Sequence, residues 1–201
     1  MSYLILVRHG ESEWNKTGTW TGLTDIGLSE IGREEARQAA EKLKDISIDQ
    51  AYTSVLSRAK ETCTIMLDAL SKKDVKITGD KALNERDYGD FTGKNKWQIQ
   101  QEVGEEQFLK IRRSYNFQIP NGESLKQVYE RVLPYYQQVI LPKLKVGKNI
   151  LISAHGNSLR ALIKYLENVS DTDIPNVEIK TGQIYLYKIG ANGTVSNKQI
   201  R

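Results

Sequence analysis

The sequence predicts an α/β fold, a three-layer α/β/α sandwich around a mostly parallel central sheet. Short apolar runs recur along the chain, and they alternate with longer stretches whose apolar residues are spaced as on one face of a helix. No Gly/Ser linker, internal repeat or low-complexity tract interrupts this alternation. We therefore expect a single domain over residues 1–201.

The first half of the chain begins with a strand and a helix. Residues 3–7 are apolar without alternation, which is typical of a strand buried on both faces. A helix is expected over residues 25–43, with Ser29 as its N-cap. The other elements expected in this half are strands over 51–53 and 75–78 and helices over 58–70 and 96–111.

The second half repeats the pattern. A long helix is expected over residues 124–144, and Pro134 should kink or interrupt it because proline removes a backbone hydrogen bond. Residues 149–154 form a second apolar strand, followed by a helix over 158–166. Two final strands, over 183–189 and 195–199, are expected to flank a turn at Asn192-Gly193.

Composition and charge exclude several classes of protein. Hydrophobic residues make up 39% of the 201 residues, which is typical of a globular chain and too many for a disordered one. One cysteine excludes an intramolecular disulfide, and with only two histidines we expect no metal site. The short N-terminal apolar run cannot span a membrane or serve as a signal peptide, so we expect a cytoplasmic protein without a membrane partner.

The net charge of +4 does not indicate nucleic-acid binding. The basic excess lies in the second half of the chain, yet no run of five or six like charges occurs. Basic and aromatic residues are not interleaved as in RNA-binding motifs. We therefore expect no nucleic-acid partner.

The two histidines occupy equivalent places. His9 follows the first apolar strand and His155 follows the strand over 149–154, each with a glycine directly after it. Ligands of open α/β sheets bind at the carboxyl ends of the strands, and glycine lets the backbone approach a ligand closely. A lone histidine is more often structural, but this pairing favours a functional site.

Cationic residues lie at loop positions similar to those of the two histidines. Any one of them alone is typical of a solvated surface, whereas together they suit a small, multiply phosphorylated ligand, since guanidinium groups bind phosphate oxygens in pairs. These cations are Arg8, Arg58, Lys96, Arg112 and Arg113.

The sequence also resembles that of a known protein family. Residues 6–15, LVRHGESEWN, are similar to the opening motif of the histidine phosphatase superfamily, and more narrowly to that of the 2,3-bisphosphoglycerate-dependent phosphoglycerate mutases. The Arg112-Arg113 pair, the Glu85 block and Lys96 point to the mutases within that superfamily. The resemblance covers roughly residues 3–188, through the segments 21–22, 28–30, 52–54, 58–59, 83–89, 112–115, 121–125 and 154–162.

The resemblance implies a phosphoglycerate mutase-like fold and an isomerase of glycolysis and gluconeogenesis. It implies that His9 becomes a phosphohistidine in exchanging phosphoryl groups between 2- and 3-phosphoglycerate, with 2,3-bisphosphoglycerate as the priming cofactor and no metal. His155, protonated, stabilises the transferring group, which Arg8 and Arg58 hold. Glu85 is the general acid or base, and burial is expected to raise its pKa. An ion pair with Arg86 or another arginine is the structural alternative for Glu85.

The resemblance also implies a set of substrate-binding residues for a small phosphorylated metabolite. The set comprises Ser12, Asn15, Thr21, Gly22, Arg86, Tyr88, Lys96, Arg112, Arg113, Gly156 and Asn157.

The chain departs from the family pattern at two positions, Leu23 and Lys94, where the family usually has tryptophan and an apolar residue. It resembles the short members of the family, which predicts a monomer or a homodimer. The chain stops at Arg201 without an extended tail over the site, so a phosphatase of the same superfamily remains the alternative activity. A non-catalytic sensor of phosphorylated ligands is the other alternative, although it has no use for His9.

Overall fold

The computed structural model of the protein describes residues 1–201 and contains a six-stranded sheet in the order β3-β2-β4-β1-β5-β6. The strands β1 to β4 run parallel to one another, whereas β5 pairs antiparallel with both β1 and β6. The predicted mostly parallel sheet is confirmed. The strands are β1 (Ser2–Arg8), β2 (Gln50–Thr53), β3 (Ile77–Gly79), β4 (Ile150–Ala154), β5 (Ile184–Ile189) and β6 (Val195–Ile200).

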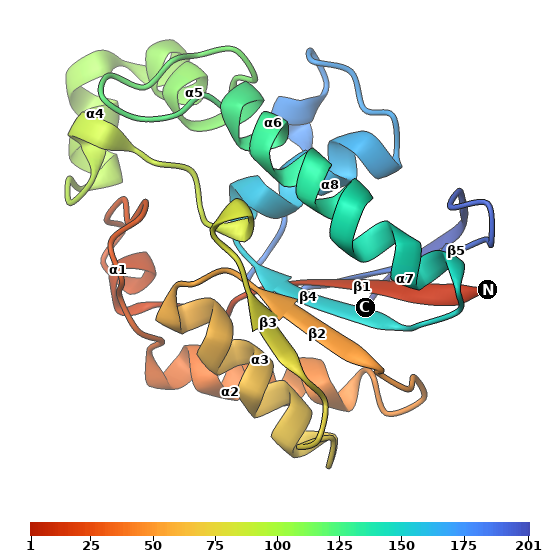
Figure 1. The fold of residues 1–201 in the computed structure, drawn as a ribbon. Coiled ribbons are helices and arrows are strands. Elements are labelled where there is room, and N and C mark those ends of the chain that lie inside the picture. The colour runs from red at the N-terminus through yellow and green to blue at the C-terminus, as the bar shows by residue number, and fades with distance from the viewer.

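Helices cover both faces of this sheet (Figure 1). Ile5 and Val7 of β1 belong to the hydrophobic cluster beneath α2 (Glu30–Glu41) and α3 (Ser57–Ala69). Leu4 and Leu6 belong to the cluster on the other face. The helices over that second face are α6 (Leu125–Tyr135), α7 (Leu141–Lys145) and α8 (Gly156–Leu166). Because both faces are buried, β1 has no polar alternation, and the three-layer sandwich is confirmed.

A smaller cluster lies beyond the carboxyl ends of the strands. It joins α4 (Lys96–Val103) and α5 (Glu105–Arg113) to the segment that follows α1 (Glu13–Lys16). Figure 1 shows α1, α4 and α5 at this end of the sheet. The buried side chains of the cluster are Trp20, Tyr88, Ile99, Phe108, Ile111 and Ile119. This cluster forms one wall of the cleft described below.

Two long helices of the sequence prediction are divided in the structure. The helix expected over 96–111 is broken at Gly104, whose φ of 78° lies in the left-handed region. The helix expected over 124–144 passes through a π-helical turn, Tyr136–Ile140, directly after the turn that contains Pro134. The predicted interruption is confirmed, since proline cannot complete the regular hydrogen-bond pattern.

Other boundaries differ by a few residues. Ser29 caps α2 as predicted, accepting a hydrogen bond from the backbone N–H of Gly32, but residues 25–28 precede the helix. The sequence did not predict α1 or three short 3₁₀ turns, Lys81–Leu83, Gly89–Phe91 and Ile174–Asn176. No helix combines the length and apolar character needed to cross a bilayer.

Candidate active site

The parallel pairing of β1 with β4 brings the two histidines together. Arg8 is paired with Ala154 at the ends of these strands, so the next residue of each strand is a histidine. The rings of His9 and His155 lie edge to face with centroids 4.9 Å apart, and both residues are buried. The site predicted at the carboxyl edge of the sheet therefore contains both rings.

The backbone determines the tautomer of His9. Its Nδ1 lies 2.7 Å from the carbonyl oxygen of Gly10, and a carbonyl only accepts, so Nδ1 carries the proton. Burial, and then the nearby His155, Arg58 and Arg8, hold the pKa of His9 well below its usual range. The ring is therefore neutral, and the lone pair of Nε2 is available as a nucleophile.

His155 is neutral as well, which corrects the expectation that it is protonated. Burial, followed by the charges of Arg58, Arg8 and Arg131, keeps its pKa well below the usual range. Its Nε2 lies 2.7 Å from the hydroxyl of Ser54, which follows β2, the strand paired with β4. Its buried Nδ1 has no partner within the protein.

Glu85 is held as a carboxylate, in contrast to the raised pKa that the sequence predicted. Burial raises its pKa, but hydrogen bonds from the backbone of Arg86 and from Asn157, together with Arg8 and Arg58, lower it below the usual value. Oε1 accepts all three bonds, at 2.7 Å from the N–H of Arg86 and at 3.1 and 3.0 Å from the backbone and side-chain nitrogens of Asn157. Oε2 is left without a protein donor, and the carboxylate forms no direct ion pair with the side chain of Arg86 or another arginine.

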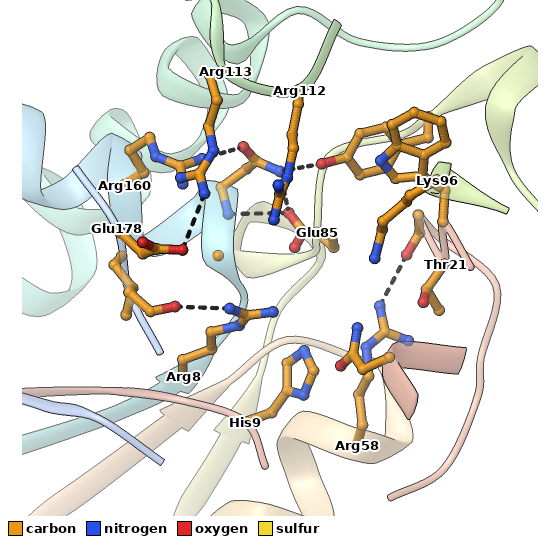
Figure 2. Close-up of a pocket in the computed structure, with 17 residues that line it drawn as sticks. Arg8, His9, Thr21, Arg58, Glu85, Lys96, Arg112, Arg113, Arg160 and Glu178 are labelled. Carbon is orange, nitrogen blue, oxygen red and sulfur yellow. Dashed lines mark hydrogen bonds and ion pairs between the residues drawn. The ribbon is translucent and has the colours of Figure 1, made fainter. Parts of the chain in front are cut away.

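The cleft around these groups is lined by six cations and two carboxylates (Figure 2). Thirteen predicted residues line it: Arg8, His9, Asn15, Thr21, Gly22, Arg58, Glu85, Tyr88, Lys96, Arg112, Arg113, Gly156 and Asn157. A Cβ at Gly156 would stand 3.7 Å from Oε2 of Glu85, an ordinary van der Waals contact, so the geometry does not itself require glycine there.

The cleft contains polar groups that the protein itself leaves unpaired. Nε of Arg8 and the Thr21 hydroxyl are buried without a hydrogen-bond partner. Unpaired buried donors are costly unless a ligand satisfies them. A small polyanion with several oxygens fits both these donors and the excess of cations.

Three predicted site residues lie behind the lining of the cleft. His155 contacts it through the ring of His9. Ser12 caps α1 by accepting the N–H of Asn15, so it positions Asn15. Arg86 is fully buried, donates to the carbonyl of Ile111 at 2.6 Å and stacks over the ring of Tyr88. Its guanidinium thus supports the wall of the cleft.

The two departures from the family pattern also lie outside the cleft. Leu23 is 43% exposed at the surface. Lys94 is exposed with its ammonium 5.7 Å from the centre of the Phe91 ring. Neither residue is part of the lining.

Four lining residues were not assigned from the sequence: Trp20, Arg160, Glu178 and Ile179. Arg160 lies one helical turn after Asn157 and donates to its Oδ1 at 2.7 Å, so the helical spacing was a usable signal. Glu178 pairs with Arg113 at 3.2 Å. The segment around it has no periodicity from which its position could be predicted.

The site does not include a metal-binding cluster, because no group of three or more His, Cys, Asp or Glu side chains is placed to hold an ion. Cys63 lies in the core, where burial raises the pKa of its thiol to about 12, so it is not a nucleophile.

Comparison with known proteins agrees with this geometry. The family described as histidine phosphatase superfamily (branch 1) matches residues 4–199. A 2,3-bisphosphoglycerate-dependent phosphoglycerate mutase of Parvibaculum lavamentivorans is 48% identical, over 98% of this chain and 95% of its own. A protein of the same name from a Chelativorans species is 49% identical, over 98% of this chain and 97% of its own.

Solved structures share the fold at lower identity. Bacillus stearothermophilus YhfR is 26% identical with a TM-score of 0.83, covering 97% of this chain and 94% of its own. The α-ribazole phosphatase of Shigella flexneri is 26% identical with a TM-score of 0.80, covering 99% of this chain and 94% of its own. With a family match over nearly all of its length and mutase relatives at almost half identity, this chain belongs to the 2,3-bisphosphoglycerate-dependent phosphoglycerate mutase family of the histidine phosphatase superfamily.

Proposed function

We propose that the protein is a phosphoglycerate mutase, an isomerase that interconverts 3-phosphoglycerate and 2-phosphoglycerate through a phosphohistidine at His9. The observation that carries the proposal is that one cation-lined cleft holds both the free Nε2 of a neutral His9 and the free Oε2 of an ionised Glu85. A phosphatase of the same superfamily also needs a nucleophilic histidine and a group that protonates the leaving oxygen. A mutase in addition needs cations for the substrate's second anionic group, and Lys96, Arg112 and Arg113 line this cleft.

The first half-reaction moves the phosphoryl group from the enzyme to the substrate. The substrate's free hydroxyl attacks phosphorus, so an O–P bond forms and the bond between phosphorus and Nε2 of His9 breaks, returning its electron pair to Nε2. Glu85 takes the hydroxyl proton on Oε2, because the carboxylate is ionised and this oxygen accepts no hydrogen bond from the protein. Arg8 and Arg58 neutralise the transferring group.

The second half-reaction restores the phosphoenzyme. Nε2 of His9 attacks the other phosphoryl group of the bound ligand, and Glu85 returns its proton to the oxygen that leaves. His155 would donate its unpaired Nδ1–H to the phosphoryl oxygens once Ser54 donates to Nε2. Lys96, Arg112 and Arg113 would hold the anionic end of the ligand that does not react.

The priming cofactor 2,3-bisphosphoglycerate fits the residues present. The excess of cations over carboxylates and the unpaired donors of Arg8 and Thr21 suit a ligand with two phosphates and a carboxylate. When bound, it supplies the phosphoryl group that charges His9.

Two measurements test the proposal. A coupled assay should show conversion of 3-phosphoglycerate to 2-phosphoglycerate that depends on 2,3-bisphosphoglycerate. Mass spectrometry after incubation with 2,3-bisphosphoglycerate should show one acid-labile phosphoryl group, absent from His9→Ala. Release of phosphate without isomerisation would reject the mutase in favour of a phosphatase, and ligand binding without a phosphohistidine would favour a sensor.

The same proposal extends to the setting of the enzyme. We propose that it works in the cytoplasm as a monomer or homodimer of one domain over residues 1–201, with small phosphorylated metabolites as its partners. A single, buried cysteine suits a reducing compartment. Sedimentation velocity would measure the oligomeric state.

A further inference from the structure

The cleft contains one carboxylate for which the proposed reaction has no use. Glu178 lines the same cleft as Glu85, but it takes no part in proton transfer and would repel an anionic substrate. Figure 2 shows its carboxylate between Arg113 and Arg8 at the rim. Its Oε1 lies 3.2 Å from a guanidinium nitrogen of Arg113.

The backbone around Glu178 is anchored, so its side chain is the movable part. The Ile179 carbonyl accepts from Arg8 at 2.7 Å and the Val177 carbonyl accepts from Arg160 at 3.0 Å. The Tyr185 hydroxyl donates to the carbonyl of Glu178 itself at 3.0 Å. The side chain of Glu178 is 65% exposed, and it can swing into solvent without disturbing these bonds.

The partner of this carboxylate is a residue that the substrate needs. Arg113 lies in the last turn of α5, and its side chain is only 15% exposed. Arg113 also faces Arg112 and Arg8, whose pKa values its charge helps to lower, so these cations repel one another before a substrate binds. Glu178 offsets part of that repulsion, and because one partner is largely solvated, the pair is weak enough for a substrate anion to replace it.

We propose that Glu178 is a built-in counter-ion of Arg113 that the anionic end of the substrate displaces, and that Glu178 thereby limits the affinity of the cleft for polyanions. The identity of that substrate, a phosphoglycerate, rests on the proposed function, whereas the competition for Arg113 does not. The consequence is that the mutase binds its substrates less tightly, and releases them faster, than its cations alone would dictate.

The direct test compares two charge-neutral variants by isothermal titration calorimetry. The probe is 3-phosphoglycerate without 2,3-bisphosphoglycerate, so that no phosphoryl transfer accompanies binding. Glu178→Gln should lower Kd about threefold to tenfold, with the gain largest at low ionic strength. Glu34→Gln, which removes an equally negative but remote charge on the surface of α2, should change Kd by less than about twofold.

A double-mutant cycle shows whether Glu178 acts through Arg113. In an Arg113→Met background, Glu178→Gln should tighten binding much less, because the cation that pairs with the carboxylate is gone while Arg112 and Arg8 remain. An equal gain in both backgrounds would reduce Glu178 to a general repulsive charge and overturn the pairing. Unchanged or weaker binding in Glu178→Gln alone would also overturn it, since Glu178 would then be a support that orients Arg113.

A second probe separates this inference from the proposed function. Inorganic pyrophosphate carries two anionic groups and does not depend on phosphoglycerate being the substrate. Tighter pyrophosphate binding by Glu178→Gln, in an enzyme that fails to isomerise phosphoglycerate, would support the counter-ion and reject the mutase. If the wild type isomerises phosphoglycerate and Glu178→Gln leaves the Kd of both probes unchanged, the mutase is retained and the counter-ion role of Glu178 is rejected.

Discussion

Lys96 gives the cleft a pH dependence that can be measured. Burial first, and then the charges of Arg112 and Arg8, lower its pKa to about 8. The protonated amine attracts the substrate and the neutral amine does not, so KM for 3-phosphoglycerate should rise as the pH increases through about 8. A bound anion favours the protonated form, which moves the midpoint upward at saturation.

Lys94, two residues before Lys96 in the sequence, provides the matched control for this pH dependence. Lys96→Met should raise KM at neutral pH and abolish its rise above pH 8, while Lys94→Met, at an exposed site outside the cleft, should preserve that rise. A KM that rises with the same midpoint in Lys96→Met would assign the titration to another group.

Arg131 is predicted to position Glu85 without touching the substrate. Its guanidinium donates to the carbonyls of Ala82, Asn84 and Glu85 at 2.8, 3.0 and 2.9 Å, and to both oxygens of Glu123 at 2.9 Å. Arg131→Met should lower kcat about a hundredfold with a smaller effect on KM, because a displacement of about 1 Å of a catalytic group costs that much.

The control for Arg131 must separate positioning from general loss of stability. Arg131→Lys keeps the charge but not the planar fork, so we expect only partial rescue of kcat. The fraction of folded protein is checked by near-UV circular dichroism at the assay temperature. A folded Arg131→Met enzyme with wild-type kcat would show that residues 82–85 hold Glu85 without this arginine.

At the scale of elements, the loop that carries His9 depends on a close glycine contact with α2. A Cβ at Gly32 would stand 2.0 Å from the carbonyl oxygen of Glu11, and one at Gly10 would stand 2.1 Å from that of Gly32. Alanine is normally favourable within a helix, by about 1 kcal/mol over glycine. Here Gly32→Ala should instead lower the free energy of unfolding by about 1–3 kcal/mol, because backbone must move, and it should reduce kcat by displacing His9.

Gly27→Ala is the matched control, since a Cβ there meets nothing within 4 Å and the residue precedes the helix. Urea unfolding of both variants measures the difference. An unchanged or higher free energy of unfolding in Gly32→Ala would show that the loop and helix separate at no cost.

The elements show what a sequence can and cannot predict. The proximity of His9 and His155 could be predicted because both follow apolar strands, and parallel strands end at one edge of a sheet. The break at Gly104 could not, because glycine is tolerated within helices and its positive φ depends on how α4 and α5 pack. Similarly, nothing in the sequence distinguishes Arg86, which is buried behind the wall, from Arg112, which lines the cleft.

The two pKa directions that differ from expectation have different origins. For Glu85, burial alone would raise the pKa, and the sequence does not indicate that Asn157 donates twice to one oxygen of the carboxylate, which lowers it. For His155, burial is the main cause of the lowered pKa, and the charges of Arg58 and Arg8 add to it. The sequence places His155 at the end of a strand but does not indicate that the residue is fully buried.

At the scale of the whole molecule, the cleft concentrates charge that the protein elsewhere balances. The net charge is +4, and six cations against two carboxylates line one cleft. Such a cleft attracts anions over a distance set by the ionic strength. Because the screening length falls from about 30 Å at 0.01 M to about 3 Å at 1 M, kcat/KM should fall at least tenfold across that range of sodium chloride.

The same charge should make thermal stability depend on ligand. The cations repel one another in the free enzyme, so an anion that binds only the folded state stabilises it by about 2.7 kcal/mol at a hundred times Kd. For a chain of 201 residues that corresponds to a Tm increase of about 5–11 °C. Differential scanning fluorimetry with 3-phosphoglycerate measures the increase, with glycerol at the same concentration as the uncharged control. A kcat/KM insensitive to salt, together with a Tm insensitive to 3-phosphoglycerate, would mean that the charges of the cleft do not act on its ligand, because both effects arise from the same uncompensated cations.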